Sequence, residues 1–196
     1  LSLPVRTGEA RVIGIEPASL VTKSLVREVK TDDAGCFQSA LNPGLTKIAV
    51  IERHKRTGKL GIGILEGYGL TGGAIATTIS HDSHNIVVAG DNDPDMLLAV
   101  RELADMGGGI VSVHGGAIRR LPLPIAGLMT SADPQEVNAV LHDMLVAARA
   151  ELGIPEDVEP FMTLSFMALP VIPELKLTAR GLFNVNTFSF VGVEAD

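Results

Sequence analysis

The sequence has a single cysteine, Cys36, no tryptophan and one tyrosine among its 196 residues. One cysteine excludes an intrachain disulfide and a zinc site built from cysteines. Aromatic residues make up only 4% of the chain, which leaves few rings on which nucleic-acid bases could stack. Because the formal net charge is −7, the chain would also repel phosphate backbones. We therefore expect no nucleic-acid partner.

Long apolar runs are lacking as well. No run reaches the roughly 18 residues of a membrane helix, and the N-terminus lacks the charged-then-apolar pattern of a secretion signal. Hydrophobic residues nevertheless make up 46% of the chain, which is typical of a packed globule. We expect a cytoplasmic protein with no membrane partner. The chain begins with Leu1 rather than Met, which indicates a processed start or a piece of a longer polypeptide.

Short β-branched runs between glycines predict most of the sheet. Alternating apolar and polar residues over 11–30 predict two strands around a turn at Glu16–Pro17, and the polar segment 31–44 is interpreted as a linker. The apolar tail, 161–191, is interrupted by prolines and is expected to wrap the sheet. Further strands are predicted at 47–53, 61–67, 73–79, 85–90, 109–113 and 117–123.

Two helices are predicted, at 93–106 and 133–152, and each starts with Asp-Pro. The apolar stripe of the first helix is expected to be Leu97, Val100, Leu103 and Ala104. In the second helix, Asp133 and Glu136 have the spacing of a capping box, and the predicted buried face is Val137, Val140, Leu141, Met144 and Ala148.

The predicted fold class is α/β or α+β, a mixed β-sheet with at least two flanking helices, preceded by a short β segment. We place the domain boundary between an N-terminal β segment or linker, 1–45, and an α/β domain, 46–196.

A polar heptad, Ile79–Asn85 (ISHDSHN), interrupts this sheet-like sequence. On a strand, Asp82 and His84 would share one face. A carboxylate beside an imidazole can transfer a proton or hold a substrate, whereas a metal site needs three or four ligands. The alternative interpretation is a polar turn whose side chains bind their own backbone.

We take Asp82, His84 and His81 as candidate catalytic residues and Ser83 and Asn85 as candidate substrate-binding residues. No metal ligand is assigned. His54 lies in a short basic run and is interpreted as part of a solvated turn.

Several long blocks carry a resemblance to a known family. They are KIAVIERHKRTGKLGIGILEGYGLTGGAIATTISHDSHNIVVAGDNDPDM, LADMGGGIVSV, LPLPIAGLMT and EPFMTLSFMALPVIPELKLTARGLFNV. Over residues 46–191 the chain resembles the C-terminal domain of bacterial adenine deaminase, which belongs to the amidohydrolase superfamily. The resemblance implies hydrolysis of adenine to hypoxanthine and ammonia. It also implies a dinuclear iron or manganese centre in a (β/α)8 barrel, whose first ligands come from a His-x-His strand.

This chain has no His-x-His, and 196 residues cannot hold that barrel in addition to this domain. The resemblance therefore implies the C-terminal part of the enzyme, with no cofactor of its own and no activity in isolation. The expected partners are the preceding barrel domain, adenine bound through that barrel, and further copies in a homo-oligomer. The heptad would face the mouth of the barrel.

Other functions stay open at this point. The chain could be a non-catalytic domain that stabilises the barrel or builds an oligomer. It could also be a free-standing protein that binds a small ligand, or part of a deaminase for another purine or a pyrimidine.

Overall fold

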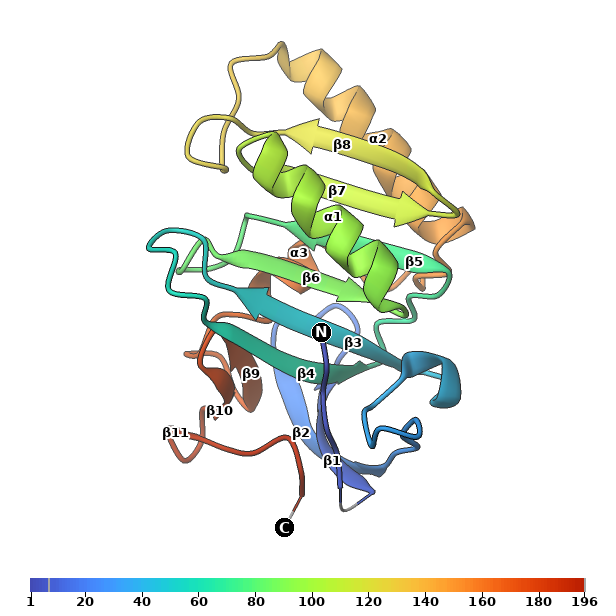
Figure 1. Ribbon diagram of the computed structural model, residues 1–196. Helices are drawn as coiled ribbons and strands as arrows, with labels where there is room; N and C mark the ends of the chain where they lie inside the picture. The colour runs from blue at the N-terminus through green and yellow to red at the C-terminus, as the bar shows by residue number, and fades with distance from the viewer. Residues whose placement is uncertain (7, 196) are drawn as a thin grey trace.

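The computed structural model describes residues 1–6 and 8–195, which form two β-sheets and three α-helices (Figure 1). A single short 3-10 helix, η1 (Ser39–Leu41), lies among these residues. The strands are β1 (Glu9–Ile15), β2 (Thr22–Glu28), β3 (Leu45–Ile51), β4 (Leu60–Glu66), β5 (Gly73–Thr77), β6 (Ile86–Gly90), β7 (Gly109–His114), β8 (Ala117–Pro122), β9 (Leu175–Thr178), β10 (Gly181–Asn184) and β11 (Ser189–Phe190). The helices are α1 (Asp93–Asp105), α2 (Pro134–Ala150) and α3 (Pro160–Phe166).

The larger sheet has eight strands in the order β2-β1-β4-β3-β6-β5-β7-β8. Its neighbouring strands are antiparallel except for β1 and β4, which are parallel. The smaller sheet is antiparallel, in the order β11-β10-β9. Helix α1 covers one face of the large sheet, while α2, α3 and the small sheet lie on the other (Figure 1). The predicted α+β class, a mixed sheet with flanking helices, is confirmed.

Helix α1 begins where Asn92 accepts a hydrogen bond from the N–H of Asp95 at 2.9 Å, with Pro94 in the first turn. Its buried face consists of Met96, Ala99 and Leu103. Leu103 is buried as predicted, but Leu97 is 39% exposed and Ala104 is exposed, so the rest of the predicted stripe was wrong by one position. Apolar residues fill 96–100 without a break, so periodicity alone cannot select the face. The small residues on the sheet below, Ala49, Ala74 and Ala76, admit Met96 and Ala99.

Helix α2 is capped by Asp133, whose carboxylate accepts from the N–H of Gln135 at 2.8 Å rather than from that of Glu136, as the predicted capping box requires. Met144 and Ala148 are buried as predicted, whereas Val140 is 38% exposed.

The tail forms α3 and the small sheet, which bury their apolar side chains against the large sheet. Tyr68 is fully buried, and its hydroxyl donates to the carbonyl of Pro160 at 2.8 Å, which fixes the start of α3. The small sheet approaches β4 so closely that a Cβ on Gly61 would lie 2.0 Å from the carbonyl oxygen of Thr178. Only glycine fits at this crossing.

Strands β1 and β2 extend the same sheet as the later strands. The linker segment packs under them, since Phe37 is fully buried in a cluster with Leu3, Val5 and Val12. The domain boundary at 45/46 stays a prediction. Among the described residues, no helix is both long enough and apolar enough to cross a membrane.

Candidate functional site

Residues 79–85, which we call the polar turn, connect β5 to β6. Strand β5 ends at Thr77, and His81, Asp82 and Ser83 form a turn. The strand interpretation of the heptad was therefore wrong, and with it the argument that Asp82 and His84 share a strand face.

Local hydrogen bonds explain why the pairing of β5 with its neighbours stops after Thr77. The hydroxyl of Thr77 accepts from the N–H of Ile79 at 3.0 Å, and the N–H of His84 donates to the carbonyl of Ser80 at 2.7 Å. Such short-range bonds compete with pairing between strands. His84 also has a φ of 49°, which is uncommon for a residue other than glycine. Strained backbone of this kind clusters at functional sites.

Three connections meet at one end of the large sheet, on the left in Figure 1. They are the β3–β4 loop (residues 52–59), the polar turn and the segment 123–130 that follows β8. The antiparallel pairing of β3 with β6 sets Ile51, at the end of β3, opposite Ile86, at the start of β6, and so brings the first two together.

The β3–β4 loop holds the polar turn by its backbone. Arg53 donates from Nε to the carbonyl of His84 and from Nη2 to the carbonyl of Ala126, both at 2.6 Å. Nε2 of His54 lies 2.9 Å from the carbonyl oxygen of Ser83. The guanidinium thus links all three connections. His54 is solvent-exposed as predicted, but its contact with the turn was not foreseen.

Glu52 makes this loop rigid. Its carboxylate accepts from the N–H groups of Thr57, Lys55 and His54 and from the Thr57 hydroxyl, at 2.6 to 3.0 Å. These hydrogen bonds, that from the Thr57 N–H above all, lower the pKa of Glu52 to about 2. The carboxylate is therefore ionised at neutral pH, and it is turned towards its own loop.

Arg53→Met should loosen the polar turn. Burial lowers the pKa of Arg53, and without the guanidinium the carbonyls of His84 and Ala126 lose its charged donors. We expect the free energy of unfolding to fall by about 1–2 kcal/mol, and amide hydrogen exchange to accelerate at residues 81–85. Urea unfolding and exchange measured by mass spectrometry check both. The matched control is Arg101→Met on the exposed side of α1. Unchanged exchange at 81–85 would show that the turn is not held by Arg53.

The five candidate residues occupy different environments. Asp82 and Ser83 are exposed, whereas Asn85 is only 8% exposed. His81 stacks on Phe166 of α3, with ring centroids 4.4 Å apart. Two buried atoms, Nδ1 of His84 and Oδ1 of Asn85, have no hydrogen-bond partner within the described part of the chain.

A cavity of about 350 Å³, which we call the turn cavity, lies beside the polar turn. The polar turn contributes Asp82, Ser83 and Asn85 to its lining, and the opposite wall is formed by Ala168, Leu169, Pro170, Val171, Thr178 and Ala179. The structure therefore brings three of the five candidates to one cavity. His81 lies against α3 instead, and His84 does not line the cavity.

A larger cavity, of about 470 Å³, lies between the β1–β2 turn and the start of α3. Its carboxylates are partly engaged, since Glu16 pairs with Lys23 at 2.6 Å and Glu159 caps α3. No buried polar atom without a partner is found among its described lining residues. We therefore regard the turn cavity as the better candidate.

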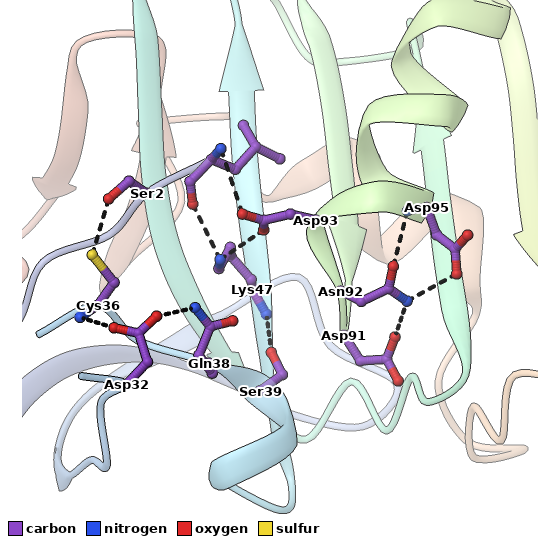
Figure 2. Close-up of polar contacts among 11 residues, drawn as sticks. Ser2, Asp32, Cys36, Gln38, Ser39, Lys47, Asp91, Asn92, Asp93 and Asp95 are labelled. Carbon is purple, nitrogen blue, oxygen red and sulfur yellow. Dashed lines mark hydrogen bonds and ion pairs between the residues drawn. The ribbon is translucent and has the colours of Figure 1, made fainter. Parts of the chain in front are cut away.

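A second polar cluster surrounds the start of α1 (Figure 2). Lys47 is 3% exposed, and its ammonium donates to the carboxylate of Asp93 at 2.7 Å. Asp91 accepts from the side chain of Asn92 at 2.8 Å and from the N–H groups of Gly72 and Gly73. Because these partners satisfy the carboxylates, the cluster is structural.

The fold and site define an α+β domain in which a clamped polar turn borders a small cavity. The chain belongs to the adenine deaminase C-terminal domain family, whose model matches residues 19–189. The family predicted from the sequence is confirmed.

Similar proteins include the adenine deaminase of Nitratidesulfovibrio vulgaris, which is 60% identical over 192 residues, 97% of this chain and 33% of that protein. Adenine deaminase 2 of Carboxydothermus hydrogenoformans is 48% identical over 98% of this chain and 34% of its own length. The adenine deaminase of Clostridium acetobutylicum is 45% identical over 97% of this chain and 34% of its own length. The chain spans about a third of the length of these curated relatives.

Proposed function

We propose that this chain works as part of an adenine deaminase, a hydrolase that converts adenine to hypoxanthine and ammonia. The observation that carries the proposal is the 60% identity, over 97% of the chain, to a protein named adenine deaminase. Family membership over residues 19–189 supports it.

The dinuclear iron or manganese centre implied by the family would belong to the amidohydrolase barrel, outside this chain. Between residues 1–6 and 8–195, no three His, Cys, Asp or Glu side chains gather as metal ligands. The residues present do not fit that centre, and we assign them no step through a metal.

In the proposed enzyme the polar turn faces the barrel mouth. Asp82 is exposed at the rim of the turn cavity, and no cation within the described range pairs with it. It is therefore free to accept a hydrogen bond from a group that another part of the enzyme or the substrate supplies. His84, with His81, would relay protons or orient the substrate. Ser83 and Asn85 would contact the substrate.

A second candidate function is a non-catalytic domain that holds the barrel or builds a homo-oligomer. Phe188 is 75% exposed and Val171 is 66% exposed. Large apolar side chains at this exposure are commonly covered by protein when they form a patch.

The experiment replaces the matching third of the Nitratidesulfovibrio vulgaris enzyme with this chain. We expect the chimaera to deaminate adenine with kcat/KM within about tenfold of its parent. The parent without this third should lose activity, and the isolated 196-residue chain should have none, with or without added iron or manganese. A folded but inactive chimaera, or activity in the isolated chain, would contradict the proposal.

A further inference from the structure

We propose that the turn cavity binds an alkylguanidinium group, the chemistry of an arginine side chain. The inference rests on the proposed function in one respect, namely that the polar turn faces another part of the enzyme. It goes further by naming the group that the turn receives.

The two sides of the cavity differ in chemistry. One wall is apolar and comes from Ala168–Val171 and Ala179, while the polar turn supplies Asp82, Ser83 and Asn85 on the other side. A ligand that matches both sides needs an aliphatic stem and a polar end. Arginine and lysine side chains have this form, because their methylene groups pack on apolar surface while the charged end stays polar.

The polar side offers hydrogen-bond acceptors. Asn85 is 8% exposed, and its Oδ1 has no partner among the described residues. Asp82 adds a carboxylate that forms no hydrogen bond or ion pair in that part of the chain. A guanidinium carries five N–H donors and no acceptor, and it binds carboxylates with two parallel hydrogen bonds. Its planar fork can therefore pair with the carboxylate of Asp82 beside the amide of Asn85.

The charges nearby favour a cation over an anion. Arg53 and His54 lie close to the turn, but Arg53 donates to the carbonyls of His84 and Ala126, and His54 contacts the carbonyl of Ser83. These groups hold the backbone and do not neutralise Asp82. An anion in the cavity would meet an unpaired carboxylate.

The polar side of the cavity is also fixed before binding. The clamp formed by Arg53 and His54 holds the turn, and Glu52 makes the loop that carries the clamp rigid. A site held in its bound geometry loses little freedom when the ligand enters, which favours binding of a small group.

The test titrates the 196-residue chain with n-butylguanidinium and follows backbone amide chemical shifts. We expect saturable shifts at residues 82–85, 168–171 and 178–179, with a dissociation constant in the range of about 1–10 mM. The neutral isostere n-butylurea should bind at least about tenfold more weakly.

Two variants isolate the acceptors. Asp82→Asn keeps the size of an exposed side chain and should weaken n-butylguanidinium at least about tenfold. Asn85→Leu, which removes the buried acceptor, should weaken it as well. The matched control is Asp33→Asn, an exposed aspartate that lies outside the cavity lining. Absence of saturable shifts, equal affinity for n-butylurea, or unchanged affinity in Asp82→Asn would each overturn the proposal.

A third ligand identifies the source of the group. Affinity for N-acetyl-L-arginine methylamide at least equal to that for n-butylguanidinium supports the side chain of a protein. Tighter binding of n-butylguanidinium by about tenfold supports a free small molecule.

Kinetics of Asp82→Asn in the chimaera separate this inference from the proposed function. If the native chain shows no saturable guanidinium shifts while Asp82→Asn lowers the activity of the chimaera, the inference fails alone. If the native chain binds n-butylguanidinium and Asp82→Asn weakens that binding but leaves kcat/KM unchanged, the catalytic role of Asp82 fails alone.

Discussion

Asp82→Asn and His84→Ala should each lower kcat/KM for adenine by about 100-fold in the chimaera, the smaller end of what proton-transfer residues contribute. Asp82 is exposed at the cavity rim, and His84 is held by its carbonyl through Arg53. Another part of the enzyme can therefore reach Asp82, and the backbone that carries the half-buried His84 is fixed beside it. Steady-state kinetics on purified, correctly folded chimaeras provide the measurement.

Asp33→Asn is the control for the change of charge and should leave kcat/KM within about threefold of the chimaera's value. A loss below about threefold in the Asp82 and His84 variants would discard their catalytic role. If those variants instead lose stability without losing activity, the polar turn is structural. The second candidate function, a non-catalytic domain that holds the barrel or builds a homo-oligomer, would then be favoured.

Lys176→Met should stabilise the chain at neutral pH and flatten its pH dependence above pH 8. Lys176 is fully buried on β9, and its ammonium donates to the carbonyl of Leu20 at 2.9 Å, with no carboxylate partner among the described residues. Burial lowers its pKa from 10.5 to about 8. The folded state therefore holds this proton less tightly than the unfolded state does.

The direction of the pH effect follows from that difference. Below pH 8 Lys176 is protonated in both the folded and the unfolded chain. Between pH 8 and about 10.5 it is protonated only in the unfolded chain. Stability due to Lys176 should therefore rise with pH across this window, by up to about 3 kcal/mol. At pH 7 the Met variant avoids the buried charge but loses the bond to Leu20, so we expect a gain of about 1–2 kcal/mol.

Urea unfolding of the native chain and of Lys176→Met at pH 7, 8, 9 and 10 measures the effect. The quantity of interest is the difference between the two curves, because contributions common to both proteins cancel in it. Lys30→Met, at an exposed position, serves as the control. Parallel pH curves for native chain and Lys176→Met would show that Lys176 does not titrate abnormally.

The parts of the fold that could be predicted have local signals. Strands β3 to β8 are short β-branched runs between turns, and both long helices start at Asp-Pro. Helix α3 and the small sheet were not predicted as elements. Prolines such as Pro170 and Pro173 interrupt that segment, and its strands form only because Leu175, Leu177 and Leu182 pack against the large sheet.

The polar turn illustrates a second limit. Apolar strands on both sides favoured continued pairing, but the hydroxyl of Thr77 and the carbonyl of Ser80 bind the local backbone instead. The cavity and the Arg53 clamp depend on residues far apart in sequence, such as Arg53 and Ala126, and no spacing rule relates them. The basic run around His54 was a visible signal, yet a solvated loop has the same composition.

The central claim is that the polar turn lies against another part of an adenine deaminase. A structure of the active chimaera tests it most directly, through the distance from Asp82 and Ser83 to the nearest atom outside this chain. We predict a contact within about 4 Å. A polar turn open to solvent, with no atom of the other two thirds of the enzyme or of a second subunit within that distance, would contradict the claim.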